Sequence, residues 1–185
     1  SVNGGPRLVV IGGDAAGMSA ASQARRVGSR ELEILAVERG PVTSYAACGL
    51  PYLVAKTVPS EEDLIARTPQ TFERDFAIRV RTRTEATDID LQGQRVHTVD
   101  ASGREREEPY DFLMIATGGV PRRPKLPGDR AEGVFGVQTL EDGVRLREYL
   151  DEHRPEHAVV GGAGYIGLEM AEAFLTRRID VTVLE

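Results

Sequence analysis

One pattern occurs twice in the 185 residues and constrains the fold more than any other feature of the chain. An apolar run leads into a glycine-rich turn, a helix-forming stretch follows, and a second apolar run ends at a glutamate. The first copy covers residues 7–38 and the second covers residues 158–185. Short apolar runs of this kind are typical of strands buried in a parallel sheet. Each copy therefore predicts a strand–helix–strand unit, and the fold class is predicted to be α/β.

The first copy has the residues that a dinucleotide needs. Residues 7–11 and 32–37 are the expected strands, and residues 18–27, rich in Ala, Gln and Arg, are the expected helix. Gly12 permits the tight turn, and Gly17 lets the helix approach the strand closely. The helix N-terminus offers free N–H groups to a pyrophosphate, and Glu38 is placed to accept hydrogen bonds from ribose hydroxyls. The turn consists of Gly12, Gly13, Asp14, Ala15, Ala16 and Gly17.

One position of this turn departs from the pattern G-x-G-x-x-G. Asp14 stands where the middle glycine is expected, and its side chain would crowd a pyrophosphate while its charge would repel one. The alternative interpretation of the first copy is an ordinary strand–helix turn that binds nothing.

The second copy keeps the glycine pattern intact at Gly162, Gly164 and Gly167. We expect strands at residues 158–160 and 179–184 and a helix at residues 168–178. Glu185 follows 18 positions after Gly167, and an acid there favours the free ribose 2′-hydroxyl of NADH over the 2′-phosphate of NADPH. Two such units in one chain predict two dinucleotide sites.

Between the two units lies the only cysteine of the sequence, Cys48. The residues after it, Gly49-Leu50-Pro51-Tyr52, predict a helix start, because Pro is tolerated in the first helical turn. A thiol at a helix N-terminus has a lowered pKa and is reactive. The alternative is a buried, inert cysteine, and the neighbouring nucleotide pattern favours the reactive interpretation.

These residues carry a resemblance to a known family. Residues 44–52, SYAACGLPY, after residues 12–21, GGDAAGMSAA, resemble the single-cysteine branch of the FAD-dependent pyridine nucleotide-disulfide oxidoreductases. The oxidases and peroxidases of that branch typically have His where this chain has Ala15, and a Gly-Met-Gln type sequence where it has Gly49-Leu50. The chain is therefore most similar to the coenzyme A-disulfide reductases. The residue before the cysteine, often Asn in that group, is Ala47.

The resemblance implies an activity and its cofactors. FAD would occupy the first fingerprint and NADH or NADPH the second, and electrons would pass through Cys48 to a small-molecule thiol or disulfide such as coenzyme A disulfide. One alternative is an NADH oxidase or peroxidase that cycles Cys48 through sulfenic acid. Another is a catalytically incomplete FAD-binding fragment.

The resemblance also implies site residues. Tyr165 would gate the nicotinamide side of the flavin, Glu169 would lie near it, and both would join Cys48 as catalytic residues. The alternative is a tyrosine packed in the helix interface and a first-turn glutamate complementing the helix dipole. For FAD the resemblance implies Gly12, Gly13, Asp14, Ala15, Ala16, Gly17, Glu38, Arg39, Ser44, Ala86, Ala116, Thr117 and Gly118. For the nicotinamide dinucleotide it implies Gly162, Gly164, Tyr165, Ile166, Gly167 and Glu185.

The rest of the chain predicts a domain plan. Residues 59–76 predict two short helices, residues 86–104 a small antiparallel meander, and residues 110–116 another buried strand. A proline-rich connector begins near residue 120. Residues 1–118 are the expected first segment of a Rossmann-like FAD-binding domain, and residues 119–185 the connector and start of an NAD(P)-binding domain. Two strands and one helix cannot cover both faces of a parallel sheet, so we expect a truncated second domain. The dimerisation domain through which family members form homodimers is then also missing.

The composition of the chain bears on its binding partners and on its location in the cell. A net charge of −6 and a pI near 5.2 argue against nucleic acid and anionic membrane surfaces. No apolar run approaches the ~20 residues of a membrane span, and no signal-peptide pattern opens the chain. The histidines show no metal-ligand spacing, so no metal is expected. A single cysteine forms no internal disulfide, which fits a cytoplasmic location.

Overall fold

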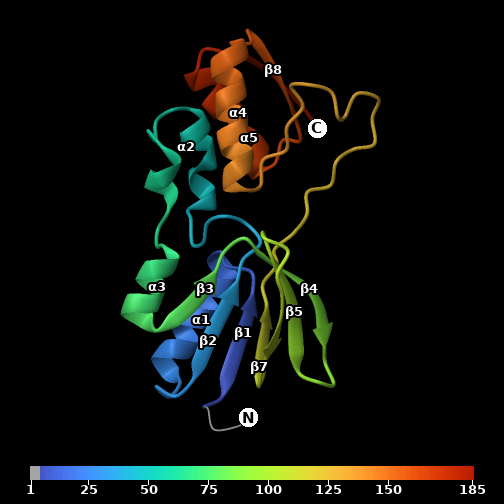
Figure 1. Ribbon diagram of the computed structural model, residues 1–185. Coiled ribbons are helices and arrows are strands. Elements are labelled where there is room, and N and C mark those ends of the chain that lie inside the picture. The colour runs from blue at the N-terminus through green and yellow to red at the C-terminus, as the bar shows by residue number, and fades with distance from the viewer. Residues whose placement is uncertain (1–4) are drawn as a thin grey trace. The chain divides into compact units, whose positions relative to one another are not determined.

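A computed structural model describes residues 5–185, and the chain divides into two compact units (Figure 1). The first unit comprises the chain up to Tyr45 together with Ile65–Gly119. The second comprises Ala46–Leu64 together with Val120–Glu185. These units are defined by packing. The assignment of residues 1–118 to FAD and of 119–185 to NAD(P) binding stays a prediction.

The first unit is built on a four-stranded parallel sheet with the strand order β3-β2-β1-β7. In this sheet Val10 of β1 lies between Ala36 of β2 and Met114 of β7. The strands are β1 Arg7–Ile11, β2 Glu33–Val37, β3 Ile78–Arg81 and β7 Phe112–Ile115, and the helices of this unit are α1 Ala15–Val27 and α3 Pro69–Phe76. The predicted α/β fold with a parallel sheet is confirmed.

Both faces of this sheet are covered, because alternate residues of each strand point to opposite faces. Leu8 and Val10 of β1 join the cluster that includes Met18 of α1 and Phe72 of α3. Val9, on the other face, joins the cluster that includes Val96 of the meander. The apolar run of β1 is therefore buried on both sides, as expected for a central parallel strand.

The predicted antiparallel meander is present, with the strand order β4-β5-β6. Its strands are β4 Thr84–Asp90, β5 Arg95–Asp100 and β6 Glu105–Pro109. At the first turn the Asp90 carboxylate accepts from the backbone N–H of Gly93 at 2.8 Å. Gly103, at the second turn, has φ +80°. The two turns fall on the Gln92-Gly93 and Ser102-Gly103 pairs, whose residue types favour turns.

A buried ion cluster ties the meander to the sheet. Glu108 of β6 is 4% exposed and accepts from Arg7 at 2.5 Å and from Arg81. A buried carboxylate needs such partners, because burial without them is costly. This cluster could not be predicted from the sequence, because its three members belong to three different strands.

The strand predicted at residues 110–116 is shorter and less buried than expected. It spans only Phe112–Ile115, and the side chains of Phe112 and Ile115 are 59% and 58% exposed. The prediction of a buried strand is therefore wrong for these two residues. The physical reason is the strand order, which puts β7 at one end of the sheet.

The second unit contains a two-stranded parallel sheet, one face of which packs against helices. Val54, Leu146, Leu150 and Phe174, among others, form its apolar cluster. The strands are β8 His157–Gly161 and β9 Asp180–Leu184, and the helices are α2 Leu50–Val54, α4 Leu140–His153 and α5 Tyr165–Thr176. Two 3₁₀ turns, η1 Ala47–Gly49 and η2 Glu61–Leu64, complete the unit.

The two helices that follow glycine turns begin earlier than predicted. α1 starts at Ala15 and not at residue 18, and α5 starts at Tyr165 and not at residue 168. The glycine turn thus runs directly into the first helical turn. The residues predicted to meet a ligand are consequently part of the helix itself.

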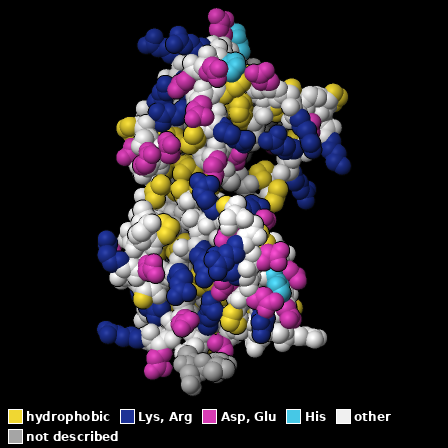
Figure 2. Space-filling model, viewed as in Figure 1, with side chains coloured by type: hydrophobic (Ala, Val, Ile, Leu, Met, Phe, Trp, Pro, Cys, Tyr) yellow, Lys and Arg dark blue, Asp and Glu magenta, His cyan; other side chains and the backbone are white. Residues whose placement is uncertain are grey.

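The surface of the chain is polar and of mixed charge. On the face seen in Figure 2, acidic and basic side chains are interspersed, so the acidic excess does not gather into one patch there. Exposed apolar side chains of the second unit include Val159, 67% exposed, and Leu184, 58% exposed. Among the described helices, none has the length and apolar character to span a bilayer.

Candidate dinucleotide and thiol sites

The first glycine turn follows β1 at the carboxyl edge of the parallel sheet. Gly12 has φ +106°, and a Cβ at this position would lie 2.1 Å from the carbonyl oxygen of Ala116. A Cβ at Gly17 would lie 1.8 Å from the carbonyl oxygen of Gly12. Both positions exclude any other residue, one through its backbone angle and both through close backbone approach. Ligands of open α/β sheets bind at this edge.

Glu38, at the end of β2, faces the turn. Its Oε2 atom accepts from the backbone N–H of Gly13 at 2.7 Å, and its Oε1 atom accepts from the N–H of Gly40 at 2.6 Å. A carboxylate has about four acceptor positions. The carboxylate is thus oriented by the backbone and keeps acceptor capacity for a hydroxyl donor.

A third segment, Thr43–Tyr45, is pinned to the same turn. The buried Thr43 hydroxyl donates to the carbonyl of Gly13, and the N–H of Ser44 donates to the same carbonyl at 3.0 Å. Ser44 has φ +51°, a left-handed conformation in which non-glycine residues are uncommon. Ser44 was expected at this site from the resemblance, whereas Thr43 was missed because its contact lies 30 residues away in the chain.

Asp14 is the unusual member of the turn. Its Oδ1 atom is buried and has no hydrogen-bond partner among the described residues. Burial raises the pKa of Asp14; the backbone N–H groups of Tyr45 and Ala15 oppose this effect, and the charge of Glu38 adds to it. The side chain is therefore present in the turn without serving as a cap for α1.

Other residues expected for FAD lie around the same edge. Ala116 directly follows β7 and donates its N–H to Ile11 at 2.7 Å. Gly118 has φ +70° and open space where a Cβ would be. Ala86 of β4 packs against the cluster that contains Ile11 at the end of β1. The remaining expected residues here, Ala15, Ala16, Arg39 and Thr117, are exposed.

The second glycine turn has nearly the same geometry as the first. Gly162 has φ +104°, and a Cβ at Gly167 would lie 2.0 Å from the carbonyl oxygen of Gly162. Glu185, at the end of β9, accepts from the N–H of Ala163 at 2.5 Å. Glu185 and Glu38 thus make the same contact at equivalent positions of the two turns. The sequence repeat is a structural repeat.

Helix capping distinguishes the two glycine turns from the starts of α3 and α4. Thr68 caps α3 with its side chain, and Thr139 and Asp142 form a reciprocal capping box on α4. Among the described residues no side chain caps α1 or α5. The five-residue helix α2 also lacks a side-chain cap. The two longer helices without one, α1 and α5, both follow glycine turns, and their free N–H groups suit an anionic ligand such as a pyrophosphate.

Tyr165 and Glu169 lie on one face of α5, because residues four apart are neighbours on a helix. Tyr165 is 91% exposed and Glu169 is also exposed. The alternative of a packed tyrosine is therefore wrong for this chain. Glu169 is the fifth residue of α5, so a first-turn role is wrong as well. Ile166 is exposed beside them.

Cys48 lies in η1, immediately before α2, and is exposed. Pro51 occupies the first turn of α2, as the sequence predicted. The alternative of a buried cysteine is wrong. The structure groups Cys48 with the second unit, since α2 packs on α4 and α5. The sequence predicts residues 46–64 to belong to the first domain.

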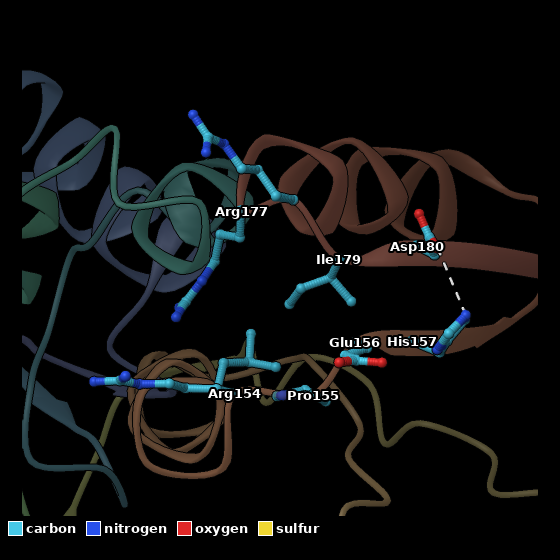
Figure 3. A pocket seen from close by; sticks show the side chains of 9 residues that line it. Arg154, Pro155, Glu156, His157, Arg177, Ile179 and Asp180 are labelled. Carbon is cyan, nitrogen blue, oxygen red and sulfur yellow. Dashed lines mark ion pairs between the residues drawn. The ribbon is translucent and has the colours of Figure 1, made fainter.

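A cavity of about 510 Å³ lies elsewhere in the second unit (Figure 3). It is lined by the C-terminal ends of α4 and α5 and by the first residues of β8 and β9, including an ion pair between His157 and Asp180. The glycine turn follows the opposite, carboxyl end of β8. This cavity is therefore not the expected nucleotide site.

The fold and the paired turns define a class: an α/β protein with two turns of the dinucleotide-binding type and an exposed thiol. Comparison with known families agrees. Residues 6–185 match the pyridine nucleotide-disulphide oxidoreductases, and the chain belongs to this family.

Two curated relatives and one solved structure illustrate the similarity. The chain is 36% identical over 179 residues to an NADH oxidase of Methanocaldococcus jannaschii, covering 97% of this chain and 40% of the relative. It is 37% identical to an NAD(P)H sulfur oxidoreductase (CoA-dependent) of Pyrococcus abyssi, covering 96% and 39%. The structure of reduced Bacillus anthracis CoADR-RHD superposes with a TM-score of 0.93 at 35% identity, covering 97% and 32%. The chain thus spans about 40% of the length of the curated relatives it matches.

Proposed function

We propose that this chain is part of a flavoprotein that uses NADH or NADPH to reduce a small-molecule disulfide, of the coenzyme A disulfide type, through Cys48. FAD is assigned to the first glycine turn and the nicotinamide dinucleotide to the second. The observation that carries the proposal is the repeated turn, uncapped and faced by an acid in both copies, in a chain with an exposed thiol.

The residues of the first turn fit a dinucleotide. The close approach of Gly17 to Gly12 brings the start of α1 against the strand, and the exposed side chains of Ala15 and Ala16 are small. Glu38 is held by Gly13 and Gly40 with acceptor capacity left. The backbone would bind the pyrophosphate, and Glu38 would accept from the ribose.

Cys48 follows closely in the chain after the segment that contacts this turn. Tyr45 belongs to the segment pinned to Gly13 and Asp14, and only two residues separate it from Cys48. At ~3.8 Å between consecutive Cα atoms, the Cα atom of Cys48 lies within about 11 Å of that of Tyr45.

The proposed chemistry at sulfur balances over two steps. The Cys48 thiolate attacks a disulfide RSSR, forms a Cys48–S–S–R bond and releases RS⁻, which takes a proton to give the first thiol. Two electrons then cleave that bond, so that a proton gives the second thiol RSH and Cys48 returns to thiolate. A bound flavin would supply these electrons after accepting hydride from NAD(P)H. Tyr165 and Glu169, exposed on α5, are assigned to the nicotinamide side of the site.

A second candidate is an NADH oxidase or peroxidase in which Cys48 cycles through sulfenic acid. The similarity to the Methanocaldococcus jannaschii NADH oxidase favours it. Ala15 and Leu50, which differ from the residues typical of oxidases and peroxidases in this branch, favour the disulfide reductase.

The experiment compares oxidants with the intact, flavin-loaded protein and NADH under anaerobic conditions. We expect coenzyme A disulfide to be turned over with release of two thiols, and peroxide to be consumed at least tenfold more slowly. Cys48→Ser should abolish disulfide reduction while leaving the bleaching of the flavin by NADH intact. Faster consumption of peroxide, or disulfide reduction that survives Cys48→Ser, would overturn the proposal.

A further inference from the structure

The segment that carries Cys48 packs against α4 and α5, two helices that lie far from it in the sequence. This segment, residues 46–64, is called the thiol loop below. Val54 at the end of α2 is fully buried in the cluster with Leu146 and Leu150 of α4 and Phe174 of α5. Leu50 at the start of α2 fills a notch at Gly143, where a Cβ would lie 2.9 Å from the Leu50 Cδ2 atom. Both ends of α2 are therefore fixed by packing.

Polar contacts fix the far end of α2 as well. Arg177, just after α5, donates from Nη1 to the carbonyl of Val54 at 3.2 Å and from Nη2 to Asp151 of α4. The Nζ atom of Lys56 lies 2.7 Å from Oδ1 of Asp151. Arg177 is also one of the residues that line the cavity of Figure 3. One carboxylate on α4 thus binds a cation from the thiol loop and a cation from the end of α5.

The ionised form of the Asp151 side chain is favoured at this position. Burial acts to raise the pKa of Asp151, but hydrogen bonds from Lys56 and Arg177 outweigh it, and the pKa is lowered. Lys56 itself has φ +64°, a left-handed conformation that is uncommon for a non-glycine residue.

The thiol loop is closed on itself around Cys48. The N–H of Ala46 donates to the carbonyl of Leu64 at 2.8 Å, and a Cβ at Gly49 would lie 2.4 Å from Leu64 Cδ2. Because α2 is only five residues long and directly follows the turn that carries Cys48, we expect a displacement at the Lys56 end of α2 to reach Cys48.

We propose that Asp151 is a positioning residue for Cys48: with Lys56 and Arg177 it fixes the thiol loop to α4 and α5, and so holds the backbone that carries the thiol. This inference rests on the proposed function for the redox role of Cys48. The contacts themselves do not depend on it.

The test uses Asp151→Asn in the intact, flavin-loaded protein. Amide hydrogen exchange, read by mass spectrometry, should become at least tenfold faster across residues 50–57 and stay unchanged in β8. In rapid-mixing experiments, reduction of the flavin by NADH should keep its rate, while reoxidation of the reduced protein by coenzyme A disulfide should slow about tenfold. Asp151→Glu, which keeps the charge, should restore much of that rate.

A matched control is Asp180→Asn, which removes an exposed partner of His157 in the same unit. It should change neither exchange in the thiol loop nor reoxidation. Lys56→Met removes the cation that the thiol loop contributes to the cluster and leaves α4 unchanged. It is measured by the same hydrogen exchange and reoxidation experiments, and Lys125→Met in the connector is its control.

The outcomes separate the two proposals. Unchanged exchange in Asp151→Asn overturns the inference. Faster exchange with unchanged reoxidation shows that the cluster stabilises the loop without positioning the thiol, and also overturns it. If the unmodified reduced protein is not reoxidised by coenzyme A disulfide, the proposed function fails, whereas the exchange result still reports on the loop.

Discussion

At the scale of single residues, the first glycine turn combines strict geometry with one exception. Gly12 and Gly17 leave no room for a side chain, whereas Asp14 places a carboxylate where the motif has a glycine. The buried Oδ1 atom of Asp14 has no partner among the described residues. A dinucleotide with its own negative charge would meet this carboxylate, so the protonation of Asp14 matters for the turn.

The pKa of Asp14 gives a prediction for the dependence of stability on pH. Because burial raises this pKa in the folded state, protonation of Asp14 stabilises the folded protein. This contribution to the free energy of unfolding is full below the unfolded pKa of about 3.9 and is lost as the pH rises through the folded pKa. Asp14→Asn should therefore gain stability relative to the unmodified chain between pH 3 and pH 7. Urea unfolding at several pH values measures the difference.

The control for this prediction is Asp88→Asn, which changes an exposed aspartate of β4. Its difference from the unmodified chain should stay flat over the same range. A flat profile for Asp14→Asn would show that its carboxylate is not penalised by burial.

At the scale of elements, the docking of the meander depends on one buried carboxylate. Glu108 brings β6 to Arg7 of β1 and Arg81 of β3, while Val96 and Ala86 supply the apolar contact with the sheet. The ion cluster lies in the unit that contains the first glycine turn. The meander begins beside the acid of that turn, because the N–H of Thr84, the first residue of β4, donates to the carbonyl of Glu38 at 2.9 Å.

Removing the charge of Glu108 should therefore destabilise the first unit. Glu108→Gln leaves two arginine side chains, 19% and 26% exposed, without their anion. We expect a loss of about 1–3 kcal/mol, below the usual cost for a fully buried pair because both arginines reach solvent. Denaturant unfolding monitored by far-UV circular dichroism measures it.

The neighbouring residue offers the comparison. Glu107→Gln removes the partner of Arg95 in an ion pair whose side chains are about half exposed, and it should change stability by no more than about 0.5 kcal/mol. Equal effects of the two substitutions would contradict the assigned role of Glu108.

At the scale of the whole molecule, local features of the fold could be predicted from the sequence and long-range ones could not. The turns, the acids Glu38 and Glu185, and the meander follow from residues within about 30 positions of one another. Arg177 and the carbonyl of Val54, by contrast, are 123 positions apart. No periodicity or motif marks such a contact. Phe112 is likewise exposed because β7 lies at the end of the sheet. The position of a strand in its sheet cannot be predicted from an apolar run alone.

Glu185 makes a prediction about the choice of coenzyme by the intact enzyme. Held by the N–H of Ala163 at the second turn, its carboxylate should accept from a ribose 2′-hydroxyl and repel a 2′-phosphate. The ratio of kcat/KM for NADH to that for NADPH should exceed about 10 and fall roughly tenfold in Glu185→Ser, the range expected for loss of one charged contact. Steady-state kinetics with both coenzymes measures it.

Glu156→Ser, at the opposite end of β8, is the control and should leave the ratio unchanged. A ratio that does not respond to Glu185→Ser would assign coenzyme choice to other residues.

The path of the thiol loop has a consequence for dissecting the protein. Because the chain passes between the units at residues 45/46, 64/65 and 119/120, no single cut separates them cleanly. A piece ending at residue 119 would retain Leu50, Leu53 and Val54 but lose α4 and α5 against which α2 packs. Such a piece should expose these apolar side chains and aggregate. Replacing residues 46–64 by a short linker should instead yield a monomeric, folded domain, because Tyr45 and Ile65, the residues to be joined, already pair as an antiparallel bridge.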